Sequence, residues 1–467
     1  MNRKVILFEL NEVPYRVLDD FAARHPRGAV AKVLDRGRQF ETITADTGQL
    51  FPTKTWPTVH RGVDNERHGL TNFGQDLSEV DRAYPSIWQL LAERGAKIGV
   101  FGSLYAFPLP KNMENYVFYA PDAFASTSDA YPAALEAFQR FNLSMSRASS
   151  RNVSRGIDLS NALGLLPHLG QLGFSRGTVF GVAEQLLSEL RDASKKGRRR
   201  SFQSVLSFDI FLRQLELKRP DFCTFFTNHV AATMHRYWAA AFPADYDHFG
   251  LGDDWVGAHG GEVEFAMMQT DKMLDRLIGF VERYPEYRLM IATSMGQAAT
   301  TAEPVTSCVG IKDMTRFLSQ FDLTARDFEE RPAMAPIFNV VVAQPEKREP
   351  LRRALDGLTV GGERFGKELY DGFFEFAFGP LQNYTGPEVA QLDGRAVSFA
   401  DMGLGNVPHE DGVYLTADHI PQGAFIVYDL RSERRAERVQ ISTLDIAPTI
   451  LENFAVSRPD YMRGVAA

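Results

Sequence analysis

The chain has 467 residues, of which 44% are hydrophobic and 24% charged, and its formal net charge is −8 at pH 7. These values are typical of a globular protein with one large α/β domain and insertions, or with about two to three domains. The negative charge argues against nonspecific nucleic-acid binding, and two cysteines are too few for a disulfide framework.

The N-terminal sequence predicts a strand at residues 5–10, VILFEL, which ends at the turn-prone NEVP. Its apolar run is interrupted at Glu9, so it is too short for a signal peptide or a membrane span. We find no longer apolar run of spanning length in the rest of the sequence. We therefore expect a cytoplasmic protein without a transmembrane segment, and the sequence does not indicate its oligomeric state.

Helix and strand patterns alternate along much of the chain. Gly95 ends a predicted helix at 86–95, and a second, amphipathic helix is predicted at 262–283. The predicted strands that follow the first one cover residues 97–101, 222–228 and 288–293. Such alternation predicts an α/β fold with a mainly parallel central sheet between layers of helices.

Two regions interrupt this pattern. Residues 120–219 carry helical periodicity and predict a helical cap insertion, whereas residues 305–400 mix short strands and helices and predict a smaller α+β insertion. The remaining residues, 1–119, 220–304 and 401–467, then form the core. The basic run at 195–200 is explained most simply by a solvated helix end, although it could also contact anionic lipid or another polyanion.

The most informative motif is LFPTKTWPTVHRGVDNERHGLTN at residues 50–72. It resembles the nucleophile region of type I phosphodiesterases and nucleotide pyrophosphatases in the alkaline phosphatase superfamily. The resemblance implies that Thr55 attacks phosphorus and that Asn72 donates to phosphoryl oxygens. Lys54 could offer a cation to phosphate or simply face solvent. The segments 85–110 and 441–464 also resemble this family.

Most of the family's metal ligands are replaced in this sequence. The family holds two zinc ions with three aspartates and three histidines, because adjacent dications need several carboxylates between them. The matched positions here carry Asn11, Ala231, Ser294 and Met295, and the histidines that remain are His235 and His409. We therefore expect no two-zinc cluster.

Other polar residues could compensate for the missing ligands. Glu9 lies two residues before Asn11, so both side chains share one face of the strand. Together with Glu9 and Asn228, the histidines His229, His235 and His409 could hold at most one divalent ion. The alternative is that no metal binds and that the histidines hydrogen-bond to one another and to Glu9.

Two functions follow from these expectations. The first is a divergent phosphodiesterase-like or pyrophosphatase-like hydrolase, or a phosphoryl-type transferase, with Thr55 as nucleophile and His229 or Glu9 as its base. Asn11, Lys54 and Asn72 would bind a small nucleotide-sugar, pyrophosphate or glycan-linked substrate. The second is a catalytically inactive pseudoenzyme that binds a ligand or a protein partner. In either case we expect Thr55, Asn11, His235, Ser294 and His409 to meet at the carboxyl edge of the sheet.

Overall fold

The computed structural model describes residues 3–150, 164, 169–331, 333, 337–413, 415–431 and 437–467. The chain forms two compact units. The first comprises Met1–Asn142, Leu159–Ala302 and Leu415–Ala467, and the second comprises Leu143–Asp158 and Glu303–Tyr414. Part of the predicted 120–219 insertion lies outside the described residues.

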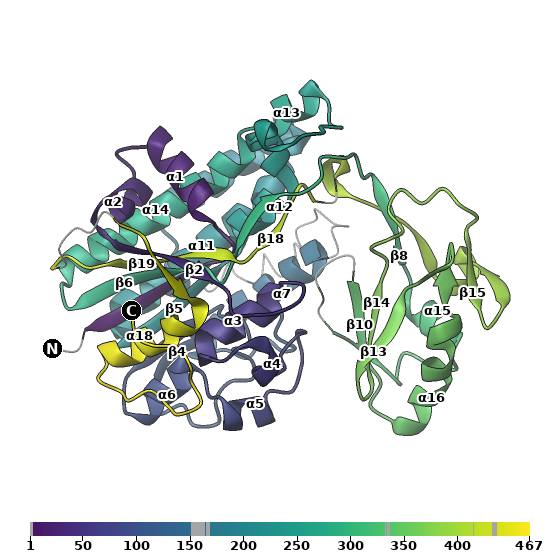
Figure 1. Ribbon diagram of the computed structural model, residues 1–467, viewed down its shortest axis with the longest axis horizontal. Helices are drawn as coiled ribbons and strands as arrows, with labels where there is room; N and C mark the ends of the chain where they lie inside the picture. The colour runs from purple at the N-terminus through teal and green to yellow at the C-terminus, as the bar shows by residue number, and fades with distance from the viewer. Residues whose placement is uncertain are drawn as a thin grey trace. The chain divides into compact units, whose positions relative to one another are not determined.

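An eight-stranded sheet is the centre of the first unit (Figure 1), with the order β20-β2-β19-β6-β1-β5-β3-β4. Every neighbouring pair is parallel except those of β19, which runs antiparallel to both β2 and β6. The strands are β1 Lys4–Leu10, β2 Arg38–Ile43, β3 Ile98–Phe101, β4 Tyr116–Ala120, β5 Phe222–Thr227, β6 Tyr287–Ala292, β19 Gln422–Tyr428 and β20 Val439–Ser442. The prediction of a mainly parallel α/β fold is confirmed.

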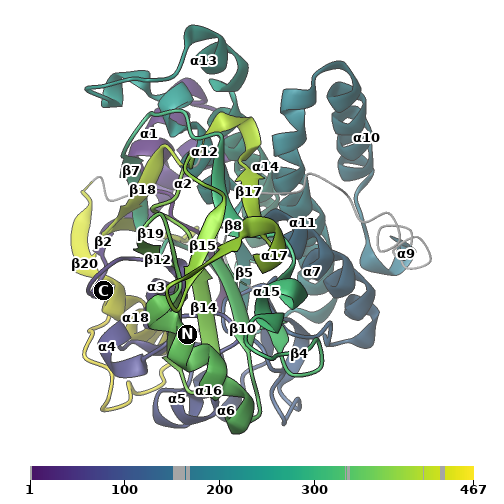
Figure 2. The ribbon, with the colours of Figure 1, turned by 90° about the vertical axis from the view of Figure 1, so that its right-hand side faces the viewer.

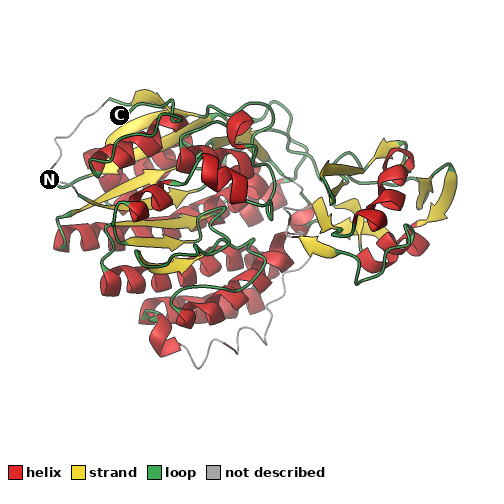
Figure 3. Ribbon diagram, turned by 90° about the horizontal axis from the view of Figure 1, so that it is seen from below, coloured by secondary structure: helices red, strands yellow, loops and turns green. Residues whose placement is uncertain are grey.

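Helices cover both faces of this sheet (Figure 3). The helices of the first unit are α1 Tyr15–Arg24, α2 Ala29–Arg36, α3 Pro52–Arg61, α4 Asn65–His68, α5 Ser78–Ala83, α6 Ile87–Glu93, α9 Leu169–Leu172, α10 Arg176–Arg191, α11 Arg199–Lys218, α12 His229–Ala241, α13 Asp253–His259, α14 Glu262–Arg283 and α18 Ile446–Asn453, and α7 Glu136–Ser150 begins in it. The predicted helix at 262–283 therefore has the bounds of α14.

Two adjacent phenylalanines on β5 show how the layers are built. Successive side chains of a strand point to opposite faces. The ring of Phe225 lies 4.9 Å from that of Phe211 on α11, whereas the ring of Phe226 lies 5.6 Å from Trp56 on α3. Because α11 packs directly on the sheet, the C-terminal part of the predicted 120–219 insertion contributes to one helical layer of the first unit.

Two short strands, β7 Gly296–Ala299 and β18 Ala417–Ile420, form a separate antiparallel pair in the first unit. Three residues separate the end of β6 from Gly296 at the start of β7, and one residue separates β18 from β19. This pair therefore lies beyond the edge of the main sheet at which β6 ends and β19 begins. The described residues contain no helix that is both long and apolar enough to cross a lipid bilayer.

The second unit has an aromatic core between small antiparallel sheets and short helices, and β10 and β14 lie side by side in it (Figure 2). Its sheets have the orders β13-β14-β10-β9, β12-β11-β15-β16 and β17-β8. The elements are β8 Ser307–Ile311, α15 Met314–Ser319, β9 Glu329–Arg331, β10 Ile337–Val341, α16 Pro345–Ala354, β11 Thr359–Val360, β12 Glu363–Arg364, β13 Gly366–Tyr370, β14 Phe373–Ala377, β15 Val389–Leu392, β16 Arg395–Ser398, α17 Phe399–Met402 and β17 Leu404–Pro408. Short strands and helices lie along residues 305–400, and their description as an insertion stays a prediction.

The packing of β3 against β4 gives a stability prediction. A Cβ atom at Gly99 would lie 2.1 Å from the ring of the fully buried Phe118. Overpacking of this kind should lower the free energy of unfolding of Gly99→Ala by about 1–3 kcal/mol. In the control Gly279→Ala, the new methyl group on α14 has no atom within 4 Å, and removal of a helical glycine should leave stability unchanged or raise it by up to about 1 kcal/mol. Urea denaturation of both variants measures the difference, and equal midpoints would contradict this account of the packing.

Candidate functional site

Polar residues follow the carboxyl ends of three adjacent parallel strands. Asn11 follows β1, Asn228 follows β5, and Ser294 lies two residues after β6. The pairings Leu10↔Thr227 and Glu9↔Ala292 place these strand ends next to one another. Open α/β sheets bind their ligands at this edge, so the candidate site is built here.

Asn11 is held on all sides by other side chains. Its Oδ1 accepts a hydrogen bond of 2.7 Å from Trp56 Nε1. Its Nδ2 donates to Glu12 Oε1 at 2.7 Å and to Asn228 Oδ1 at 2.6 Å. Both amide hydrogens and the amide oxygen are engaged inside the protein. Asn11 is therefore held in place and positions the carboxylate of Glu12.

Thr55 lies against Ser294, as the motif comparison led us to expect. Its hydroxyl donates to Ser294 Oγ at 2.8 Å and also lies 3.3 Å from the carbonyl oxygen of Phe51. Thr55 is 0% exposed. Neither of these two partners is a base that could take the hydroxyl proton.

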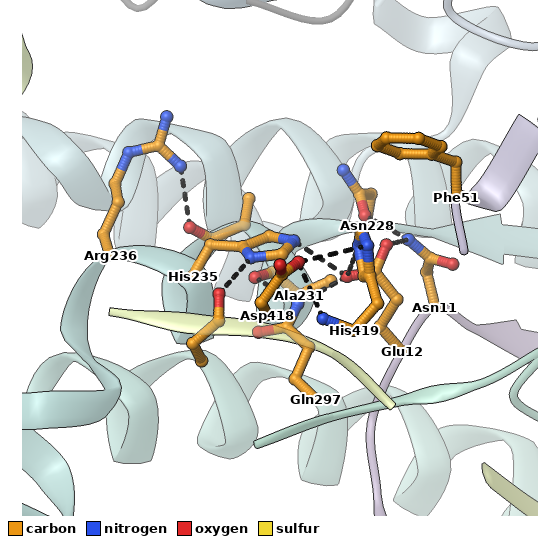
Figure 4. A network of polar contacts seen from close by, with 12 residues as sticks. Asn11, Glu12, Phe51, Asn228, Ala231, His235, Arg236, Gln297, Asp418 and His419 are labelled. Atoms are coloured by element: carbon orange, nitrogen blue, oxygen red, sulfur yellow. Dashed lines mark hydrogen bonds and ion pairs between the residues drawn. The ribbon is translucent and has the colours of Figure 1, made fainter. Parts of the chain in front are cut away.

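The chemically most distinctive group is formed by Glu12, His235 and His419 (Figure 4). Glu12 Oε2 lies 3.0 Å from His235 Nε2 and 3.3 Å from His419 Nε2. One ligand atom from each of the three residues lies within 4.8 Å of the other two. The side chains point toward one another from three different elements: the turn after β1, helix α12 and strand β18.

Contacts around this cluster fix the orientation of its side chains. His235 Nδ1 is 2.8 Å from the carbonyl oxygen of Ala417. A carbonyl only accepts, so Nδ1 carries a proton, and Nε2 is the ring nitrogen that faces Glu12. Gln297 Nε2 donates to Glu12 Oε2 and, at 3.2 Å, to the carbonyl oxygen of Ala231.

The charges of the cluster favour a cation between these side chains. Burial opposes the charged form of Glu12, but His419 and His235 outweigh it and hold the pKa of the carboxyl well below its ordinary value. Burial likewise opposes a charged His419, but Glu12 outweighs it and raises the pKa of that imidazole. A carboxylate facing two imidazole nitrogens can therefore share a proton or take a divalent ion.

The donor set of Glu12, His235 and His419 fits one metal ion. Two imidazoles and one carboxylate are common ligands of Zn²⁺ and other borderline divalent ions, with further positions left for water or substrate. The residues that the motif comparison matches to other metal ligands of that family have different surroundings. Asn11 Oδ1 accepts from Trp56, and Ser294 Oγ accepts from Thr55. Met295 is a buried thioether, which is too soft a ligand to replace a histidine.

Two residues that were predicted to ligate or act as bases lie elsewhere. Glu9 Oε1 is 2.8 Å from His60 Nε2, and this pair is buried between β1 and α3. His229 is buried against α14, with Nδ1 2.6 Å from Thr227 Oγ1 and Nε2 3.1 Å from the carbonyl oxygen of Ala266. Burial lowers the pKa of His229 to about 4. Both of its nitrogens have protein partners, so its geometry is that of a structural histidine.

The remaining predicted residues have the following places. His409 belongs to the second unit. His419 lies beside His235, at the place that was expected for His409. Lys54 Nζ donates to the carbonyl oxygen of Gln49 at 2.9 Å. Asn72 Nδ2 donates to Thr71 Oγ1 at 3.0 Å. The substrate-binding roles of Lys54 and Asn72 stay predictions.

Three members of the site were missed in the sequence. Glu12 was not predicted because the alternation of side chains along the first strand favours Glu9. The backbone of Glu12 is left-handed, with φ of 61°, so its side chain does not follow that alternation. His419 stands in TADHI, three residues before β19, the antiparallel strand of the main sheet. Gln297 follows the matched TSMG segment by one residue and offered no signal of its own.

The buried, neutral state of His229 gives a pH prediction. Its pKa of about 4 in the folded protein lies below the ordinary value of about 6.5 in an unfolded chain. Between these values the unfolded state binds a proton that the folded state does not, so stability falls as the pH decreases from about 6.5 to about 4. His229→Gln should have a shallower decrease over this window in urea unfolding curves. An identical pH slope in the variant would show that His229 is not held neutral.

No protein-family model and no curated protein matches the sequence. Among solved structures, the chain is similar to human ectonucleotide pyrophosphatase/phosphodiesterase 5, with 11% identity, a TM-score of 0.44 and coverage of 100% of this chain and 97% of that one. It is also similar to the murine protein of that name, and to an inactive variant of it in complex with AMP, each with 11% identity, a TM-score of 0.42 and coverage of 98% and 96%.

Proposed function

We propose that the protein is a hydrolase of small phosphate diesters or pyrophosphates that uses one divalent metal ion held by Glu12, His235 and His419. The observation that carries this proposal is the convergence of a buried carboxylate and two imidazoles at the ligand-binding edge of the sheet, with ligand atoms within 4.8 Å of one another. The phosphate class of the substrate rests on the motif at residues 50–72. A nucleotide-sugar, a pyrophosphate or a glycan-linked phosphate would each belong to it.

The residues of the chain prepare this site in a defined way. Asn11 and Gln297 donate to the two oxygens of Glu12 and keep the carboxylate ionised and oriented. The carbonyl oxygen of Ala417 accepts from His235 Nδ1 and orients the ring so that Nε2 faces the carboxylate. A bound divalent ion would supply Lewis-acid polarisation of a phosphoryl oxygen and acidify a water molecule.

The position of Thr55 favours water over threonine as the nucleophile. A threonine hydroxyl needs an adjacent base or a metal to react at neutral pH. Thr55 is fully buried and donates to the Ser294 hydroxyl. In our proposal Thr55 therefore ties α3 to the end of β6, and the attacking group is a water molecule at the exposed side of His235.

The first test concerns the metal. Protein dialysed against Zn²⁺ or Mn²⁺ should retain about one equivalent, measured by mass spectrometry of the metal content. His419→Ala should weaken binding by more than about 100-fold, because even outer-shell losses cost 10–100-fold. His409→Ala is the matched control and should bind like the wild type. Two tightly held equivalents, or loss of binding in His409→Ala alone, would overturn the assignment.

A second test separates the roles of Thr55. Thr55→Val removes the hydroxyl at nearly constant shape and leaves Ser294 without its donor, so it should cost about 1–3 kcal/mol of stability. Turnover of phosphodiester, pyrophosphate and nucleotide-sugar substrates should stay within about tenfold of wild type, whereas loss of a nucleophile costs several orders of magnitude. Thr55→Ser, which keeps the hydroxyl, controls for packing. Abolished turnover in Thr55→Val with full turnover in Thr55→Ser would identify Thr55 as the nucleophile.

A catalytically inactive protein of this fold is the second candidate. The observation that favours it is that Thr55, Ser294 and Asn11 satisfy one another or their neighbours within the protein. Such a protein would still bind the metal through Glu12, His235 and His419. Metal binding without turnover of any of these substrates would therefore favour a ligand-binding or partner-binding role.

A further inference from the structure

Asn228 stands at a position where its side chain would ordinarily cap a helix. It is the residue directly before α12, between the end of β5 and His229. An asparagine at such a position usually accepts a hydrogen bond from a backbone N–H group of the first helical turn. The side chain accepts no such bond here, and its Oδ1 instead accepts from Asn11 Nδ2 at 2.6 Å. The side chain is therefore directed toward the end of β1, where the candidate metal site lies.

A chain of donors and acceptors fixes the orientation of this amide. An indole N–H group can only donate, so Trp56 Nε1, at 2.7 Å, must face the amide oxygen of Asn11. The amide nitrogen of Asn11 then faces Glu12 Oε1 at 2.7 Å and the side chain of Asn228 at 2.6 Å. Because this nitrogen can only donate, Asn228 must present its oxygen to Asn11. The amide nitrogen of Asn228 is therefore directed away from Asn11.

This nitrogen is open toward the cluster's surroundings. Asn228 is half-buried, and its Nδ2 has no acceptor among the residues that the structure describes. Figure 4 shows Asn228 and Phe51 on the same side of the cluster formed by Glu12, His235 and His419. The ring of Phe51 lies 5.8 Å from that of His419, so this side borders the ligand atoms. A donor that is held in place beside a cation site is suited to the oxygen of an anionic ligand.

Asn228 differs in this respect from two other amide side chains beside the cluster. Asn11 donates to Glu12 and to Asn228. Gln297 Nε2 donates to Glu12 and to the carbonyl oxygen of Ala231. Each of these two amides thus directs both of its hydrogens at oxygens of the protein, whereas Asn228 keeps its hydrogens for a group from outside. One nitrogen, that of Asn11, positions both the carboxylate of Glu12 and the outward amide of Asn228.

We propose that Asn228 Nδ2 donates to a phosphoryl oxygen of the substrate, the role that the motif comparison implied for Asn72. This inference rests on the proposed function, in which a metal ion at the Glu12 cluster acts on a phosphate diester or pyrophosphate. A neutral amide does not repel the ion, as a lysine or arginine would. Because the amide is already oriented by Asn11, little reorganisation is needed when the substrate binds.

The test is calorimetric titration of inorganic phosphate into the full chain loaded with Zn²⁺, with the metal content measured separately by mass spectrometry. Asn228→Asp keeps the oxygen that accepts from Asn11 and replaces the outward NH₂ group by a second oxygen. It should retain the metal like the wild type and bind phosphate more than about 100-fold more weakly, because repulsion replaces a charge-assisted hydrogen bond. Asn228→Ala, which removes the donor without adding charge, should bind phosphate about tenfold to 100-fold more weakly.

Asn112→Asp is the matched control for the added charge. Asn112 is exposed, its Oδ1 also accepts a hydrogen bond, from the backbone of Glu114 at 3.0 Å, and it precedes β4 at the amino edge of the sheet. This variant should bind phosphate like the wild type. A purely structural role of Asn228 predicts wild-type phosphate binding in Asn228→Asp, and that result with the metal retained would overturn this inference alone. So would a zinc-loaded wild type that binds no phosphate. A wild type that retains no metal would instead overturn the proposed function, and this inference with it.

Discussion

The contact between the Glu12 carboxylate and two imidazoles is the interaction on which the candidate site depends. A carboxylate that is 1% exposed is costly unless charge and hydrogen bonds compensate for the lost water. His235 and His419 supply the charge, and Asn11 and Gln297 supply the hydrogen bonds. Because these partners come from separate elements, the site can form only when strand β1, helix α12 and the β7–β18 pair are in place.

The same edge of the sheet holds a second group of polar residues that is satisfied internally. Thr55 bonds to Ser294, and Trp56 bonds to Asn11. In the phosphodiesterases that the motif resembles, these positions serve the nucleophile and a metal ion. Here hydroxyl and amide groups replace the charged ligands, so the neighbouring side chains neutralise one another without an ion.

The sequence predicted the sheet well and the site only in part. Apolar runs and helix ends located β1, β3, β5, β6 and α14 closely. The spacing of apolar residues and the residues that end a helix or strand are local properties of the sequence. Thr55, Asn11 and His235 were placed at the correct edge by motif and strand order. Glu12 and His419 escaped because their proximity depends on a left-handed turn and on a strand pairing between β7 and β18, neither of which leaves a periodic signal.

The place of β19 has a consequence for how the chain acquires its structure during synthesis. This strand, residues Gln422–Tyr428, lies between β6 and β2 and is antiparallel to both. Until it emerges from the ribosome, β2 has no neighbour that connects it to β6, and the hydrogen-bonding edge of β6 stays open. An open edge on a buried strand invites pairing with other chains. The nascent protein therefore passes through a long interval in which half-formed sheet is vulnerable to misassembly, and a chaperone that shields strand edges would act during that interval.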